Sequence, residues 1–282
     1  MGDTIDDLLR TARSHLAATP FGAPPREAYL LLGDLLGLSE AQLIARGDLK
    51  VPEDCAKLFS HRLQRRLQGE PVAYLLGWRE FFGRRFRVDD RVLIPRPETE
   101  HLIEAALQVS GHPPSRILDV GTGSGCLAIT LALELPNARI TASDLSLSSL
   151  ALAARNVHEH GVGGRVRLVQ GDLTEAISLR AFDLVISNPP YIDPADREQL
   201  SPEIREFEPP DALFAQDRGL ALFQRLLERA KELPPESALM IEIGFGQLEE
   251  IRTRATDLGL CISDQISDYA GIPRTLVLRR VP

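Results

Sequence analysis

The segment Ile117–Gly125, with the sequence ILDVGTGSG, decides the fold class of this 282-residue chain. Its first four residues are apolar apart from one aspartate, which predicts a short buried strand. Glycines at alternate positions then predict a tight turn, and an apolar stretch predicts a helix over 124–135. A strand that enters a helix through a glycine-rich turn is typical of a ligand site in a doubly wound parallel sheet.

The remainder of the chain after this segment alternates in the same way. Short apolar runs predict strands over 139–143, 166–170, 182–187 and 238–243, and helical spacing predicts helices over 146–160, 220–233 and 247–258. Two further strands, over 260–266 and 274–279, are close enough in sequence to be antiparallel neighbours. The pattern therefore predicts an α/β fold, a Rossmann-like doubly wound sheet with an antiparallel last strand.

The part of the chain before this segment has a different organisation. Apolar residues at helical spacing, separated by glycines and prolines, predict a small helical bundle without strands. Two short strands over 78–82 and 84–88 then predict a β-hairpin, and Pro97 is well placed to begin a helix over 97–109. We expect a helical domain over residues 1–76, a hairpin linker over 77–96 and a catalytic-type α/β domain over 97–282.

Composition limits the function classes. The formal net charge of −8 argues against a bulk nucleic-acid binder, and no window of about 18 apolar residues predicts a membrane span. The three cysteines are far apart, which gives no disulfide framework and no zinc spacing, and His158 and His160 do not share a helix face. We expect a cytoplasmic, monomeric protein without a metal site.

Carboxylates after the predicted strands indicate the ligand. Cys126 stands where a dinucleotide fingerprint has its third glycine, so a ligand without a pyrophosphate fits the loop better. Asp144 ends the second strand and can accept both hydroxyls of a ribose, whereas Asp119 can pair with an ammonium group. Asp172, after the third strand, can meet an adenine amino group or can simply be a turn residue. This set is consistent with S-adenosylmethionine.

A second unusual stretch, Asn188–Tyr191, follows the strand over 182–187 and reads NPPY. Prolines at 189 and 190 have no N–H and hold the backbone extended. A planar amide could donate its two hydrogens to the Asn188 side-chain oxygen and the Pro189 carbonyl, with the Tyr191 ring over its flat face. The alternative is a plain turn at the end of the strand, since Asn-Pro and Pro-Pro are common turn dipeptides.

Longer motifs resemble those of the HemK/PrmC family of protein N5-glutamine methyltransferases, over nearly the whole chain. The resemblance rests on segments in both predicted domains: 69–77, 79–83, 93–100 (LIPRPETE), 121–125, 188–192, 207–209 (FEP), 242–244 (EIG) and 268–271 (DYAG). The NPPY motif alone is shared with DNA adenine methyltransferases, whereas the LIPRPETE segment is more specific.

The resemblance implies a class I methyltransferase fold with S-adenosylmethionine as cofactor. It also implies that the substrate is the glutamine of the Gly-Gly-Gln motif in class-1 peptide-chain release factors. The expected catalytic residues are Asn188, Pro189, Pro190 and Tyr191. The expected cofactor-binding residues are Asp119, Gly121, Thr122, Gly123, Ser124, Gly125, Asp144, Asp172, Leu173 and Asn188. Leu173 stands where some family members have a tryptophan beside the adenine.

Three alternatives remain open at this point. The substrate could be a glutamine of a ribosomal protein, for which the motif would be the same. N6-adenine methylation of DNA would call for a basic groove, which a chain of net charge −8 does not indicate. A non-catalytic binding module would not need the intact glycines, Asp144 and Asn188. The role of Arg96 is left open between a hinge, a substrate contact and an ion pair.

Overall fold

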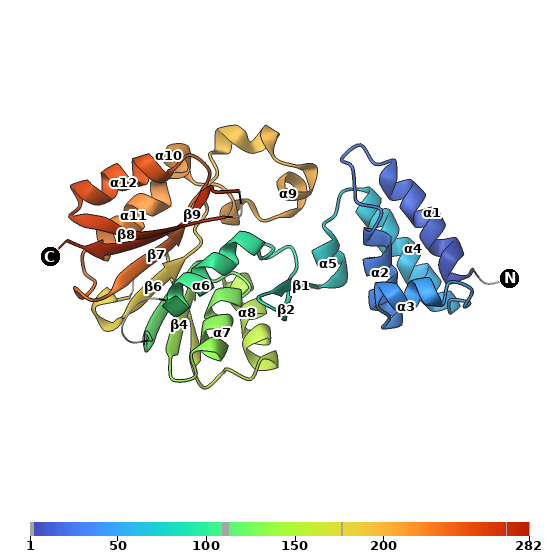
Figure 1. Ribbon diagram of the computed structural model, residues 1–282, viewed down its shortest axis with the longest axis horizontal. Coiled ribbons are helices and arrows are strands. Elements are labelled where there is room, and N and C mark those ends of the chain that lie inside the picture. Colours follow the sequence, from blue (N-terminus) through green and yellow to red (C-terminus); the bar gives the residue numbers. More distant parts are fainter. Residues whose placement is uncertain (1–2, 109–112, 176, 269, 282) are drawn as a thin grey trace. The chain divides into compact units, whose positions relative to one another are not determined.

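The chain divides into two compact units. A computed structural model describes residues 3–108, 113–175, 177–268 and 270–281 (Figure 1). One unit is Met1–Trp78 with Gln199–Phe207, and the other is Arg79–Glu198 with Glu208–Pro282. The boundaries that we expect from the sequence, at residues 76 and 96, stay a prediction.

The first unit is a helical bundle. Its helices are α1 (Ile5–Ala17), α2 (Glu27–Leu36), α3 (Glu40–Ala45), α4 (Glu53–Leu67), α5 (Val72–Leu76) and α9 (Pro202–Phe207). Thr4 and Ser39 cap α1 and α3, each accepting a hydrogen bond from the backbone N–H three residues on. The expected helices are present, but the sequence analysis assigned no element to 199–207, which belongs to this unit.

A buried arginine ties α9 to this bundle. The Arg66 side chain is fully buried and pairs with Glu27 of α2 at 2.6 Å and with Glu203 of α9. Its guanidinium also lies over the Phe21 ring, 5.0 Å from the centroid. A buried charge is tolerated only when it is paired, so the two carboxylates and the arginine depend on one another.

The second unit is built on a seven-stranded sheet with the order β5-β4-β3-β6-β7-β9-β8. The strands are β3 (Arg116–Val120), β4 (Arg139–Asp144), β5 (Val166–Gln170), β6 (Leu184–Ser187), β7 (Ala238–Glu242), β8 (Leu260–Ser267) and β9 (Pro273–Arg280). Strands β3 to β7 pair in parallel, and β9 runs antiparallel to both β7 and β8. The predicted doubly wound sheet with antiparallel final strands is confirmed.

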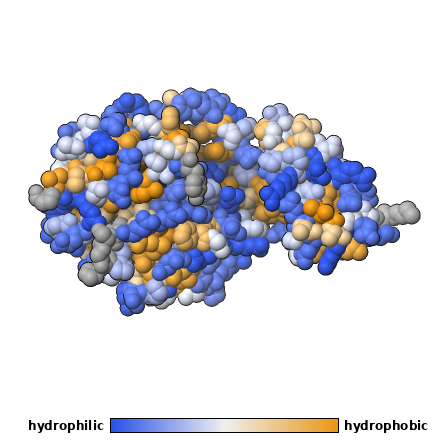
Figure 2. All heavy atoms as spheres, viewed as in Figure 1, coloured by the Kyte–Doolittle hydropathy of each residue, from blue (hydrophilic) through white to orange (hydrophobic). Residues whose placement is uncertain are grey.

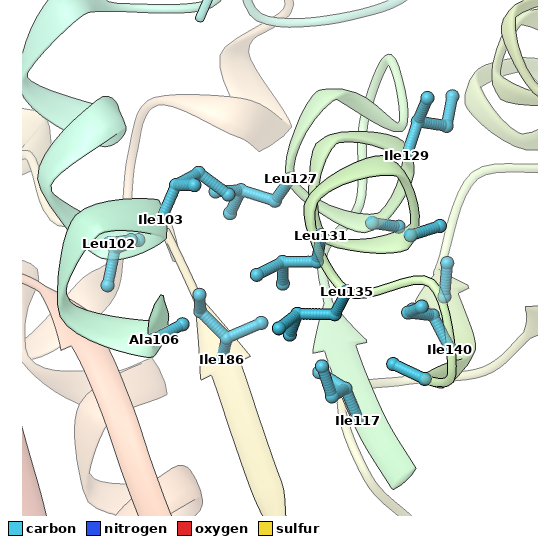
Figure 3. Packing of buried hydrophobic residues seen from close by; sticks show 14 of the residues in the cluster. Leu102, Ile103, Ala106, Ile117, Leu127, Ile129, Leu131, Leu135, Ile140 and Ile186 are labelled. Carbon is cyan, nitrogen blue, oxygen red and sulfur yellow. The ribbon is translucent and has the colours of Figure 1, made fainter. Parts of the chain in front are cut away.

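Helices cover both faces of this sheet (Figure 1). One apolar cluster joins the sheet to α6 (Glu100–Gln108), α7 (Cys126–Glu134) and α8 (Leu147–Glu159), and the other joins it to α11 (Ala221–Ala230) and α12 (Leu248–Asp257). Figure 3 shows Leu131 of α7 and Leu135, which directly follows that helix, packed toward the strand residues Ile117 and Ile186, with Leu127 beside Ile103 of α6. Because both faces are covered, the inner strands β3, β6 and β7 are buried along nearly their whole length, without alternation.

The predicted hairpin is also confirmed, as β1 (Trp78–Phe81) and β2 (Arg84–Arg87). Phe82 and Gly83 between them both have positive φ, 49° and 69°, as a tight two-residue turn requires. The helix expected over 97–109 is a 3-10 turn, Pro97–Thr99, followed by α6, and residue 109 lies outside the described residues.

The region between β6 and α11 departs most from the sequence analysis, which placed no element there. It contains the 3-10 turns Pro194–Gln199 and Pro210–Ala212, helix α9, and the short helix α10 (Gln216–Gly219). These turns and helices are too short to show a periodic apolar pattern in the sequence.

On the face of the protein shown in Figure 2, apolar residues lie in separate patches among polar ones.

Candidate active site

The candidate site lies where two neighbouring strands end. From β3 the chain moves outward to β4 and β5, and then returns to β6 on the other side of β3. Val120, the last residue of β3, is paired in register with Ser187, the last residue of β6. The glycine loop and Asn188–Tyr191 therefore leave adjacent strand ends. This reversal of strand order is the place where open α/β sheets bind ligands.

The glycine loop leaves room for a ligand. Gly121 and Gly123 have positive φ, 74° and 54°, which disfavours other residues. A Cβ atom added at either position would meet no atom within 4 Å, so open space lies above the loop. At Gly125, in contrast, a Cβ would lie 3.1 Å from Ile129 Cδ1 and 3.4 Å from Ala153 Cβ, so this glycine lets α7 pack against α8.

Asp144 stands at the carboxyl end of β4, as expected, and fixes the glycine loop. Its Oδ2 accepts a hydrogen bond from the backbone N–H of Gly123 at 2.9 Å, and its Oδ1 accepts one from Ser146 at 2.9 Å. Burial raises the pKa of this carboxyl, and the backbone donors offset part of the rise. Each oxygen keeps a further lone pair, so the carboxylate can still accept from ribose hydroxyls.

Asp119, in β3, is fully buried, and its Oδ2 accepts a hydrogen bond from the Thr122 hydroxyl at 2.6 Å. Its other oxygen, Oδ1, is buried without a hydrogen bond among the described residues, and the backbone N–H of Ala128 favours the charged form of the carboxyl. Burial raises the pKa of Asp119 to about 7. An unpaired carboxylate oxygen beside the loop suits a cationic group such as an ammonium. Ser124 is buried, and its carbonyl accepts from the Asn156 amide at 2.8 Å.

The two residues expected beside an adenine, Asp172 and Leu173, contact helices α11 and α12 rather than the glycine loop. Asp172 forms an ion pair with Arg225 of α11 at 2.9 Å, and no hydrogen bond joins its side chain to the glycine loop among the described residues. Leu173 is half-buried against the apolar cluster of α11 and α12. Its φ of 48° is unusual for a leucine, and such strained residues cluster at functional sites.

Backbone contacts hold the NPPY stretch in place. The Tyr191 carbonyl accepts a hydrogen bond from Gln247 Nε2 at 3.0 Å, and the next residue, Ile192, bridges to Phe214. Gly219 passes so close that a Cβ there would lie 2.0 Å from the Tyr191 oxygen. Tyr191 is therefore clamped by residues that lie far along the chain.

A buried chain of hydrogen bonds links this stretch to two residues that the sequence analysis did not assign to the site. Asn188 Nδ2 donates to Thr99 Oγ1 at 3.0 Å, and Thr99 Oγ1 donates to Glu242 Oε2 at 2.7 Å. The Tyr191 hydroxyl donates to Glu242 Oε1 at 3.4 Å. Burial raises the pKa of Glu242 to about 7 and also raises the pKa of Tyr191. The sequence does contain a signal for Glu242, which is a glutamate at the end of the otherwise apolar strand ALMIE.

Arg96 makes an ion pair with the buried Glu208 at 2.5 Å, and Glu208 also accepts from the Ile94 N–H at 3.2 Å. These contacts connect the LIPRPETE and FEP motifs.

Of the DYAG motif, Tyr269 lies outside the described residues. Within the described residues, no group of three or more His, Cys, Asp or Glu side chains could hold a metal ion. No helix in the same ranges is both long and apolar enough to cross a membrane.

Comparisons with known proteins first identify the class. Residues 7–77 match the PrmC N-terminal domain, and residues 99–204 match the Methyltransferase small domain. A crystal structure of a methyltransferase from Pyrococcus furiosus has a similar fold, with a TM-score of 0.54 at 20% identity, over 79% of this chain and 100% of that one. The fold and the glycine-loop site thus define a class I methyltransferase.

Relatives then identify the family. The release factor glutamine methyltransferase of Nitratidesulfovibrio vulgaris is 40% identical over 98% of this chain and 95% of its own length. The enzyme of the same name from Chlorobaculum tepidum is 43% identical over 97% of this chain and 96% of its own. The chain belongs to the release factor glutamine methyltransferase family. The resemblance drawn from the motifs is confirmed.

Proposed function

We propose that this protein transfers a methyl group from S-adenosylmethionine to the side-chain amide nitrogen of a glutamine, the one in the Gly-Gly-Gln motif of class-1 peptide-chain release factors. The observation that carries the proposal is the register of β3 and β6. It brings the glycine loop and the NPPY stretch to adjacent strand ends through the pair Val120 and Ser187. A methyl donor over the loop and an amide at NPPY would then lie side by side.

The residues at the end of β3 and β4 fit the cofactor. The open space over Gly121 and Gly123 admits a ligand close to the backbone, and the unpaired Oδ1 of Asp119 is suited to its ammonium group. Asp144 would accept from the ribose hydroxyls. Asp172 and Leu173 would border the adenine. The Asp172 carboxylate would then be shared between the adenine and its ion pair with Arg225. When bound, the cofactor supplies an electrophilic methyl group on a sulfonium.

The NPPY stretch would hold the substrate amide. Among the described residues, no hydrogen bond reaches Oδ1 of Asn188 or the carbonyl of Pro189, so both oxygens can accept from an –NH2 group. Pro190 stiffens the backbone that carries them, and the Tyr191 ring would cover the amide. Carboxamide nitrogen is a weak nucleophile, so positioning must supply much of the rate, up to about 7–11 kcal/mol in favourable cases. The two accepting oxygens would also stabilise positive charge as it develops on that nitrogen.

The identity of the relatives favours a release factor over the alternatives. Both relatives compared above carry that substrate in their names and align over nearly their full length, including the helical front part. A net charge of −8 does not favour a DNA substrate. With a translation factor as its partner, the enzyme would work in the cytoplasm, and we expect it to act as a monomer without direct nucleic-acid binding.

Labelled cofactor provides the test. The protein is incubated with a class-1 release factor, with the same factor carrying glutamate in place of the Gly-Gly-Gln glutamine, with ribosomal proteins, and with DNA. Peptide mass spectrometry then locates the methyl group. We expect one added methyl on that glutamine and none on the other substrates. If the protein binds the cofactor but leaves the release-factor glutamine unmodified, the proposal is wrong.

A further inference from the structure

Two buried side chains outside the NPPY motif, Thr99 and Glu242, form a chain of hydrogen bonds with its asparagine. We propose that Thr99 and Glu242 are positioning residues that fix the Asn188 carboxamide with its oxygen toward the substrate, and that this orientation selects glutamine over glutamate. The inference rests on the proposed function. It follows from the chain of hydrogen bonds from Asn188 Nδ2 to Thr99 and from Thr99 to Glu242, at 3.0 and 2.7 Å.

The direction of each bond follows from counting hydrogens. The Thr99 hydroxyl has one hydrogen, and it donates that hydrogen to a carboxylate, which can only accept. Its oxygen must then accept from Asn188, so the –NH2 side of the carboxamide faces inward. The oxygen of Asn188 is left for the ligand. A rotated carboxamide would bring two acceptor oxygens, those of Asn188 and Thr99, against each other.

Burial makes this arrangement difficult to replace. Thr99 is 3% exposed and Glu242 is 1% exposed, so water has little access to either partner. The groups that act on Glu242 lie on different elements: Glu98 in the turn before α6, Arg274 in β9, and the Tyr191 hydroxyl at 3.4 Å. An unsatisfied polar group in such surroundings is costly. While Glu242 is ionised, the hydrogen bonds from Asn188 through Thr99 to Glu242 therefore have one favoured donor-to-acceptor direction.

The orientation has a consequence for specificity. An inward –NH2 group presents an acceptor to the substrate, which a glutamine amide can satisfy by donating a hydrogen. A glutamate carboxylate has no hydrogen to donate and would meet the Asn188 and Pro189 oxygens directly. Sites built to bond one polar group reject analogues that cannot make the bond far more strongly than apolar pockets reject small size differences.

Thr99→Val tests the inference, because it replaces the hydroxyl with a methyl of similar volume. With cofactor saturating, we would measure the KM and kcat of a release factor and the inhibition constant of its glutamine-to-glutamate form. In Thr99→Val the carboxamide is free to rotate, so we expect kcat to fall by about tenfold or more and the preference for glutamine over glutamate to fall by about tenfold. Thr99→Ser restores the hydroxyl and should recover both within about threefold.

Thr130→Val is the matched control. Thr130 in α7 is fully buried and its hydroxyl has no hydrogen-bonding partner among the described residues. This variant makes the same chemical change without disturbing the hydrogen bonds from Asn188 to Thr99 and from Thr99 to Glu242. Its turnover and its preference for glutamine over glutamate should therefore match the wild type. The inference is overturned if Thr99→Val keeps the preference of Thr130→Val. Failure of the proposed function is a different result, in which the wild-type protein itself does not methylate the glutamine.

A measurement on the wild-type protein keeps the inference testable even if Thr99→Val does not fold. Protonated Glu242 can donate to Thr99, which frees the Thr99 hydrogen to donate to Asn188 and turns the carboxamide round. We therefore expect the preference for glutamine to fall as the pH is lowered from about 8 to about 6, at saturating cofactor. In solution the glutamate of the inhibitor stays ionised over this range. Glu242→Gln, which has no titrating group at this position, should lose the pH dependence and so separates protonation of Glu242 from protonation of the bound inhibitor. A preference that is constant with pH would contradict the inference.

Discussion

Cofactor binding should be linked to the ionisation of Asp119. Burial raises the pKa of this carboxyl to about 7, and one of its oxygens has no hydrogen bond among the described residues. If the ammonium group of S-adenosylmethionine pairs with that oxygen, the bound state requires the carboxylate form. Binding must then remove a proton from the fraction of molecules that carry one, so we expect the affinity to rise with pH.

The magnitude follows from the position of this pKa. A carboxyl with a pKa of about 7 is ~9% ionised at pH ~6 and ~76% ionised at pH ~7.5, so the affinity should rise about eightfold over this interval. About half a proton should be released per cofactor bound at pH ~7. Measurements should not extend above about pH 7.5, because the pKa of an α-amino group is about 8 and the loss of its proton opposes the rise in affinity.

Isothermal titration calorimetry in buffers with different ionisation enthalpies measures both the affinity and the released protons. Asp119→Asn removes the titrating group, so its affinity should be weak and nearly independent of pH. Glu242→Gln serves as the control, because Glu242 also has a pKa of about 7 but lies beside Asn188 and Tyr191. Its affinity should keep the wild-type pH dependence. A constant wild-type affinity, or a pH dependence that survives in Asp119→Asn, would refute the reasoning.

Four further predictions concern single positions. Asn188→Ala should retain cofactor binding in a titration, but its turnover should fall by about a hundredfold because the amide loses an acceptor; wild-type turnover would contradict the role given to Asn188. Asp144→Ala should weaken cofactor affinity by about tenfold, measured by calorimetry, and unchanged affinity would reject the ribose contact. Gly219→Ala places a Cβ 2.0 Å from the Tyr191 carbonyl oxygen and should lower the free energy of unfolding by roughly 2 kcal/mol or more in urea titrations. Arg66→Ala leaves the half-buried carboxylates of Glu27 and Glu203 without their partner and should cost about 2 kcal/mol by the same measurement, a loss that a surface substitution such as Arg10→Ala should not produce.

The sequence was sufficient for the fold and for the edge at which the site lies. Strand and helix periods, the glycine loop and the two prolines after Asn188 are local patterns, and each acts over a few residues. Because carboxyl ends of parallel strands share one edge, the sequence alone places the glycine loop and Asn188 on that edge. The sequence did not predict the helices and 3-10 turns over 192–219, because they are short and have no periodic apolar face.

Only the tertiary structure decided which way the Asn188 carboxamide faces and how readily Asp119 ionises. The Asn188 partner Thr99 lies 89 positions away, and Thr99 in turn meets Glu242 over 143 positions, so no local pattern reports these bonds. The pKa of Asp119 depends on everything packed around it, which the residues of one strand do not specify. Periodicity and turn chemistry are properties of neighbours in sequence, whereas desolvation and hydrogen-bond direction arise only when distant segments exclude water together.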